Sequence, residues 1–231
     1  MIMSKNPESL TKREILLVLI IFIVSMTNFW IYSIYQTNFF LGEILIIETA
    51  LLYLSILPHK NIALPILIYI ILGVISLILL TNNFDKSLFL TSINDSIRID
   101  HRRNYFYNDL GKIYANIGGI IYFNKLRLYF NNIQSNLFYP LDWSVYFSPT
   151  RLIDEGKYAL LFGPFFIVGL IYLIGKNKKT IIIYFIISLL VNTFIKLDHK
   201  LEPLLLFPIV NICIGLGLIK FIEKLKTIFL K

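Results

Sequence analysis

Long apolar runs dominate the chain and predict its architecture. A bilayer core of about 30 Å needs roughly 17–25 mainly apolar residues per helix, and helices satisfy their own backbone amides in lipid. We therefore predict an all-α polytopic membrane protein, a single membrane domain over residues 1–231 with about six transmembrane helices. The second and fifth of these stretches are short and carry polar residues. The predicted spans are Ile15–Tyr35, Leu41–Leu57, Ile62–Thr81, Tyr158–Gly175, Thr180–Leu197 and Pro203–Ile222.

Composition supports the membrane class. Hydrophobic residues make up 57% of the chain and charged residues 16%, whereas a soluble domain carries about a quarter charged residues. The first apolar run is too long for a signal peptide and ends in "TNFWIYSIY" instead of a small-residue cleavage site. Because Trp30, Tyr32 and Tyr35 are residue types that favour the membrane interface, we expect the run to be retained as a span.

Basic residues in the short segments between the spans predict the orientation. Eleven flank one side of the predicted bilayer, at both termini and in "PHKN" and "GKNKKT", and two, Lys196 and Lys200, flank the other. Since cytoplasmic loops are enriched in Lys and Arg, we predict a cell-membrane protein with cytoplasmic N- and C-termini. This placement accounts for half of the 22 basic residues, so the charge of +8 predicts no nucleic-acid partner.

The orientation makes residues 82–157, between spans three and four, a long extracytoplasmic loop. It holds nine basic and seven acidic residues. The stretch "GKIYANIGGIIYFNKLRLYFNNI" predicts helices with broad apolar faces interrupted by Asn, Lys and Arg. Helices of this kind lie in the membrane interface with the apolar side down. We expect a loop rich in interfacial helices that covers the outer ends of the spans as a cap.

Two carboxylates in the second span are candidates for function, because an acidic side chain near the centre of a membrane helix costs about 2.5–3.5 kcal/mol. Glu43 lies near the outer end of the span, where it is our candidate general base, and Glu48 lies deeper. Their spacing of five residues turns them roughly 140° apart on a helix, so they do not form a pair. Glu48 either lines a functional cavity or is a structural residue that is protonated or paired with Asn28 or Asn192.

Four basic residues are candidates for binding a lipid phosphate. Arg102 and Arg103 lie in "IRIDHRRNYFYND", and a guanidinium matches phosphate oxygens in bidentate fashion. His199 and Lys200 lie in "FIKLDHKLEPLLLFPIV", just before the last span. The alternatives are arginines that bind headgroups in general and a polar turn between two helices.

Metal and cofactor sites are not predicted. Cys213 is the only cysteine and lies in an apolar run, and no spacing links the three histidines as ligands. The chain contains no P-loop, nucleophile elbow or Cys/His metal motif.

Two stretches together resemble one family. "NKLRLYFNNIQSNLFYPLDWSVYFSPTRLIDEGKYALLFGPFFIVGLIYLI", Asn124–Ile174, is similar to a region of the GT-C membrane glycosyltransferases, the oligosaccharyl- and mannosyl-transferase-like class. "DHKLEPLLLFPIV", Asp198–Val210, is similar to that family's late extracytoplasmic turn. The resemblance implies a lipid-phosphate-linked sugar donor bound at the outer leaflet. It also implies that Arg102, Arg103, His199 and Lys200 contact the phosphate and that a carboxylate in the first external loop activates the acceptor.

The chain departs from the family in its N-terminal part. The first external loop, "QTNFFLGE", contains no Asp and only Glu43 at its edge, and such enzymes have around twice as many spans. The resemblance is therefore compatible with an enzyme or with an accessory, non-catalytic relative that binds polyprenyl phosphate. The second hypothesis is a non-enzymatic membrane protein whose extracytoplasmic loop binds a partner protein. A transporter fits less well, because no pseudo-repeat is evident.

Overall fold

The computed structural model describes residues 12–56, 63–79, 97, 101, 117–122, 126–148, 156–175, 179–194 and 201–229. Throughout these residues the regular structure is helical, and no strand occurs among them, which confirms the all-α prediction. The longer helices are α1 (Lys12–Met26), α2 (Phe29–Thr37), α3 (Phe39–Ile56), α4 (Ala63–Leu79), α8 (Arg127–Phe138), α10 (Gly163–Gly175), α11 (Lys179–Phe194) and α12 (Phe207–Phe229). The shorter ones are α7 (Ile117–Ile121), η4 (Tyr139–Leu141), α9 (Ser144–Phe147), η5 (Leu160–Phe162) and η6 (Leu204–Leu206).

Each of the six apolar stretches contains a helix, but three differ from the prediction. The first is broken, because α1 and α2 meet at an angle of 61°. The fourth begins with the 3₁₀ turn η5, so that α10 starts only at Gly163. The sixth continues past Ile222 to Phe229, and its last turns carry the charged residues of the chain's C-terminal end.

One helix among the described residues has the length and composition to cross a bilayer. This helix is Leu204–Phe229, with 26 residues, and the bent pair Glu14–Met26 and Phe29–Thr37 would add a second. Two further helices, Leu160–Gly175 and Ile181–Thr193, are apolar but shorter. The structure thus supports membrane association through at least one helix, and the six-span arrangement stays a prediction.

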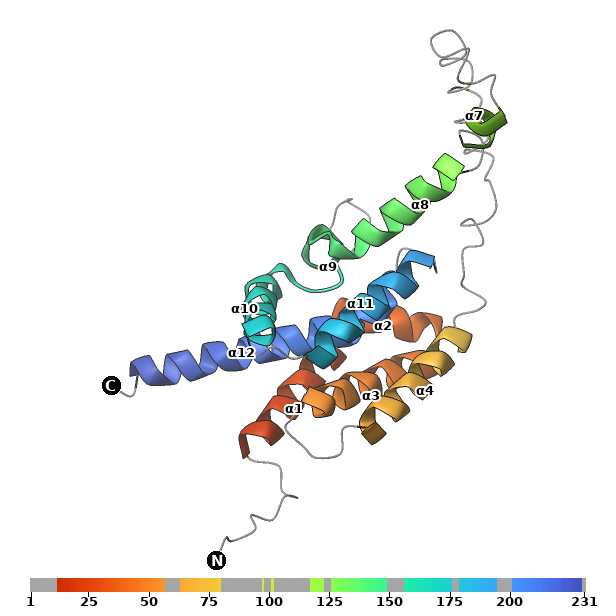
Figure 1. The fold of residues 1–231 in the computed structure, drawn as a ribbon. Helices are drawn as coiled ribbons and strands as arrows, with labels where there is room; N and C mark the ends of the chain where they lie inside the picture. The colour runs from red at the N-terminus through yellow and green to blue at the C-terminus, as the bar shows by residue number, and fades with distance from the viewer. Residues whose placement is uncertain are drawn as a thin grey trace, which may run out of the picture.

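Helix α12 is the centre of the fold (Figure 1). Its first half is buried almost completely, from Phe207 to Gly217. It packs against α1, α3 and α10. A helix that is apolar on every side needs such all-round cover, either from protein or from lipid. Much of the remaining apolar surface lies on the outward faces of α1, α4, α10 and α11, where large aliphatic side chains such as Ile23, Ile70, Ile171 and Ile183 are about half exposed or more.

Glycines bring α10 and α12 into backbone contact. A Cβ at Gly169 would overlap the carbonyl group of Cys213, and a Cβ at Gly217 would overlap that of Phe165. On α10, Gly169 lies four residues after Phe165, and on α12, Gly217 lies four residues after Cys213. The two contacts are therefore reciprocal, and the helices run antiparallel. Small residues at helix crossings permit this approach in membrane proteins, where dispersion contacts replace the hydrophobic driving force.

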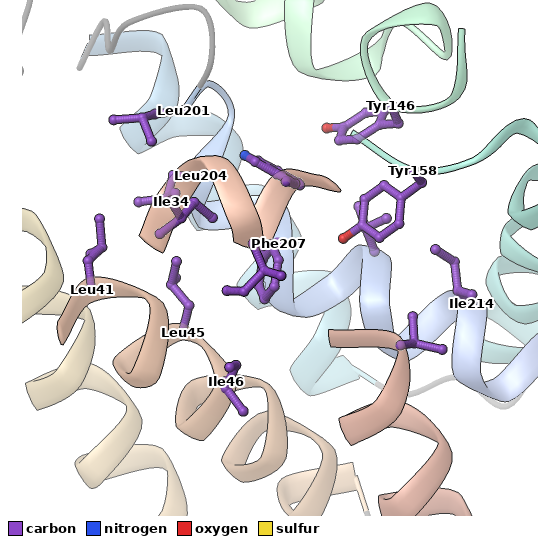
Figure 2. Packing of buried hydrophobic residues seen from close by; sticks show 14 of the residues in the cluster. Ile34, Leu41, Leu45, Ile46, Tyr146, Tyr158, Leu201, Leu204, Phe207 and Ile214 are labelled. Carbon is purple, nitrogen blue, oxygen red and sulfur yellow. The ribbon is translucent and has the colours of Figure 1, made fainter. Parts of the chain in front are cut away.

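A large core cluster lies at the end of the bundle where α12 begins. Figure 2 shows Ile34 of α2, Leu41 and Leu45 of α3, and Leu204 and Phe207 around the start of α12 converging there. Tyr146 of α9 and the neighbouring Tyr158 join the same cluster from the segment that precedes α10. Residues from the predicted cap therefore share a hydrophobic core with the helices.

Candidate functional site

The break between α1 and α2 is built around Asn28. Its side-chain oxygen accepts a hydrogen bond from the backbone N–H of Ile31 at 2.7 Å, and its amide group donates to the carbonyls of Val24 and Ser25, both at 2.9 Å. Asparagine is a preferred N-cap because its side chain satisfies a free amide of the first turn. Asn28 thereby ends α1 and starts α2 in a new direction.

Glu43 lies on the first turns of α3, half-buried and close to α2. The Tyr35 hydroxyl donates a hydrogen bond to Glu43 Oε1 at 3.0 Å. The Tyr35 ring crosses the surface of Gly42, where a Cβ would approach its ring carbons to 2.5 Å or less, and it stacks on Phe39 with a centroid distance of 5.2 Å. The glycine therefore makes room for the ring that carries the hydroxyl to Glu43, and one oxygen of the candidate base already has a donor.

Glu48 lies deeper in α3, and its side chain is 0% exposed. Neither carboxyl oxygen has a hydrogen-bond partner among the described residues. The two amides considered as partners do not pair with it: the side chain of Asn28 is used at the helix break, and the Asn192 amide nitrogen has no acceptor in the described part of the chain. The paired alternative for Glu48 is therefore wrong, and an unpartnered buried carboxyl remains.

Three helices enclose the carboxyl group of Glu48. On α4, a Cβ added to Gly73 would stand 3.7 Å from Glu48 Oε1, and Ser76, which is completely buried, follows one turn later. On α11, the buried hydroxyl of Tyr184 interacts electrostatically with Glu48. Tyr184 in turn bonds to Ser188 and donates to the carbonyl of Leu205 at 2.6 Å. The sequence placed Glu48 in the interior of a span, and the structure adds Tyr184 on α11 as an electrostatic neighbour and, on α4, a glycine at which a methyl group would just contact the carboxyl.

A second polar cluster joins the end of the predicted cap to the helices. The backbone N–H of Trp30 donates to the carbonyl of Lys157 at 3.1 Å, and Lys157 Nζ lies 5.3 Å from the centroid of the Trp30 ring. The Tyr158 hydroxyl donates to Asn211 Oδ1 at 3.1 Å, deep in the first half of α12. Trp30 is only 1% exposed, so its ring packs inside the protein, whereas Tyr32, another of the aromatics expected at the membrane interface, is 63% exposed.

Tyr146 connects two parts of the cap and also bonds to the segment before α10. Its hydroxyl donates to the carbonyl of Pro140 at 2.8 Å, and its own carbonyl accepts from the N–H of Tyr158 at 2.8 Å. Burial, and to a lesser degree the neighbouring Tyr139, raises the pKa of Tyr146 well above its ordinary value. The hydroxyl therefore remains protonated and available as a donor. Sequence reasoning missed Trp30, Lys157 and Tyr146 as a unit, because nothing local links positions more than a hundred residues apart.

The four basic candidates, Arg102, Arg103, His199 and Lys200, lie outside the described residues. Their neighbours in sequence are described: His101 is exposed, whereas Leu201 is buried in the core cluster next to the start of α12. In the part of the chain that the structure describes, no three His, Cys, Asp or Glu side chains are grouped in a way that could hold a metal ion.

Comparisons with protein-family models, curated proteins and solved structures found no match to this chain. The GT-C resemblance therefore stays a prediction from sequence motifs, and the function must be inferred from the contacts between the described residues.

Proposed function

We propose that the chain is a six-span membrane protein with cytoplasmic termini, and that its extracytoplasmic cap binds a polyprenyl-phosphate-type lipid at the outer surface, as in GT-C glycosyltransferases. The observation that carries this proposal is the junction of the cap with the helices. Residues from the cap lie against those helix ends that the proposed topology assigns to the outer side.

Three contacts support the proposal that the cap lies against the outer ends of the helices. Lys157 meets Trp30 at the α1–α2 break. Asn136 of α8 donates to the carbonyl of Thr193 near the end of α11 at 3.3 Å, and α8 runs along α11 (Figure 1). Leu201, just before α12, belongs to the same buried cluster as residues of α2, α3 and α9. In a chain that threads the membrane six times, the end of span five and the start of span six belong to the outer side, and the break at Asn28 falls in the outer half of span one.

The surface chemistry of this end suits a lipid ligand. Large apolar side chains of α8 and η5 are exposed, and the most exposed are Phe130, Phe138, Leu160 and Leu161. Exposed apolar patches of this kind mark membrane or ligand contacts. The basic residues Arg102, Arg103, His199 and Lys200 would supply charge-assisted hydrogen bonds to the phosphate at the head of the lipid.

Lipid binding can be measured on the purified protein in nanodiscs that contain a polyprenyl phosphate. We expect Arg102→Gln combined with Arg103→Gln to weaken binding by about ten- to a hundredfold, since hydrogen bonds to charged groups are worth about 1.5–3 kcal/mol. The variants His199→Gln and Lys200→Gln should act in the same direction. The matched control is Lys176→Gln combined with Lys178→Gln, which removes the same charge from the proposed cytoplasmic side and should leave binding unchanged.

Equal affinity in the wild type and in all three outer-side variants would refute the lipid proposal. Crosslinking from exposed positions of α8, such as Ser135, distinguishes the alternative. Capture of lipid agrees with the proposal, whereas stoichiometric capture of one protein would favour a cap that binds a partner. A catalytic role for Glu43 has its own test: glycosyl transfer should be lost in Glu43→Gln, and full activity in that variant would exclude it as the general base.

A further inference from the structure

The carboxyl group of Glu48 has the setting of a binding site and not of a structural contact. It is completely buried, and neither oxygen has a hydrogen-bond partner in the described part of the chain. Buried polar side chains in folded proteins are nearly always paired, because an unpaired one loses its hydration without compensation. In a membrane span, an ionisable residue of this kind is typical of an ion pathway or of a proton relay.

Among the described residues, the helices packed around Glu48 bring no cation beside it. Neither α2 nor α4 contains a charged residue. The charged residues of the other neighbouring helices lie at their ends: in the first turn of α1, at the first residue of α11, and from Lys220 onward in α12, where Lys220 pairs with Glu223. The titratable side chain that interacts with Glu48 is Tyr184 of α11, and its hydroxyl is engaged with the carbonyl of Leu205.

We propose that Glu48 is an exchangeable proton-binding site inside the bundle, enclosed by α3, α4 and α11. A proton needs only the carboxyl oxygen, whereas a divalent cation needs several oxygen ligands and, as a rule, more than one carboxylate. At Gly73 a methyl group would only just contact Oε1, so the glycine leaves the space of a methyl group beside it, and Tyr184 of α11, hydrogen-bonded to Ser188, is its electrostatic neighbour. Uptake and release of the proton at this point change the charge between α3 and α4, so the site links protonation to the packing of α4.

The site can be probed with dicyclohexylcarbodiimide, an apolar reagent that enters the bilayer and reacts with protonated carboxyl groups. The acid transfers its proton to a carbodiimide nitrogen while its oxygen bonds to the central carbon, and the adduct rearranges to a stable N-acylurea. Mass spectrometry of the full-length protein in nanodiscs should show one adduct, mapped to Glu48. The adduct should disappear in Glu48→Gln and persist in Glu43→Gln, which removes the half-buried carboxyl of the same helix as a matched control.

The pH dependence of labelling separates an exchangeable proton from a permanent one. We expect the labelling rate to fall by about tenfold for each pH unit above a midpoint between about pH 5 and about pH 9, as a single titrating group requires. A constant rate across this range, or an adduct at Glu43 instead, would overturn the proposal. Replacing choline by Na⁺ at constant pH should leave the rate unchanged, and protection by Na⁺ would overturn the proton assignment in favour of a cation.

The control for folding is independent of the label. Glu48→Gln has almost the same size and shape as the wild-type residue, so it should elute and melt as the wild type does. A loss of labelling in a protein that remains folded is then assigned to the carboxyl group. Should Glu48→Gln fail to fold, the pH profile and the mapped adduct of the wild-type chain still decide the proposal.

Discussion

The contact between α10 and α12 and the contact between α3 and α4 are opposite solutions to helix packing. In the first, two glycines rest on backbone carbonyls of the partner helix, and no room is left for a methyl group. In the second, Gly73 faces a buried carboxyl across a gap in which a methyl group would make ordinary contact. The first contact is specified by shape and the second by a polar group that nothing in the described chain satisfies. This difference indicates that α10–α12 stabilises the fold, whereas α3–α4 accommodates a buried, unpartnered carboxyl at some cost in stability.

The largest expected effect is at the closely packed crossing. Gly169→Ala or Gly217→Ala forces the carbonyl of the partner helix away, and overpacking costs about 1–3 kcal/mol. Gly175→Ala, on the same helix α10 but with nothing within 4 Å of its Cβ position, is the matched control. Thermal unfolding in detergent, followed by circular dichroism, measures all three. Unchanged melting of both crossing variants would show that this contact is not a determinant of stability.

An effect of opposite sign is expected at Glu48. Glu48→Met replaces an unpartnered buried carboxyl with an apolar side chain of similar length, and removal of such a group should stabilise the folded protein by about 1–3 kcal/mol. Glu48→Gln keeps a buried polar group and should change the melting temperature little. If Glu48→Met melted below the wild type, the carboxyl would have a stabilising partner. The α3–α4 contact would then not contain an unsatisfied polar group.

A smaller loss is expected where the first residue of the fourth apolar stretch meets α12. Tyr158→Phe removes the hydroxyl that donates to Asn211 and leaves the ring packing intact, so the loss should be about 1 kcal/mol. Tyr32→Phe is the control, since this hydroxyl belongs to an exposed side chain of α2. Equal melting of the two variants would mean that the Tyr158 hydrogen bond to Asn211 does not stabilise the fold.

The smallest effect is expected at Gly73. Gly73→Ala places a methyl group at van der Waals distance from Glu48 and should shift the free energy of unfolding by less than about 1 kcal/mol, with the sign set by the gain in helix propensity. Compared directly with Gly169→Ala, this variant measures how differently the two helix pairs are packed. A loss at Gly73 as large as at Gly169 would contradict the open α3–α4 contact.

Helices could be predicted from the sequence because long apolar runs need few other signals. All six stretches contain helices, and the depth of Glu48 follows from its position in the second run. The break at Asn28 interrupts a continuous apolar run, so hydropathy could not reveal it, although Asn28 as an N-cap residue was a local signal. Hydropathy also does not say whether an apolar face meets lipid or protein, so it could not predict that Trp30 is buried inside the protein.

The polar contacts of the candidate sites could not be predicted from the sequence, for a different reason. Tyr35 reaches Glu43 only because the chain turns at Asn38 and Gly42 leaves space for the ring. The neighbours of Glu48 come from α4 and α11, and their approach depends on how three helices pack. Lys157 and Trp30 meet through tertiary contacts of the cap. Spacing within one element predicts none of these pairings.

The proposed lipid-binding function requires the cap and the end of α12 to lie on opposite sides of the membrane. Two single cysteines test this directly in a Cys213→Ala background: Ser135→Cys on α8 and Lys226→Cys in the last turn of α12, both at exposed positions. A membrane-impermeant maleimide applied to intact cells should label Ser135→Cys at once and Lys226→Cys only after permeabilisation. Labelling of both cysteines from the same side would contradict the topology, and with it the proposed lipid-binding cap.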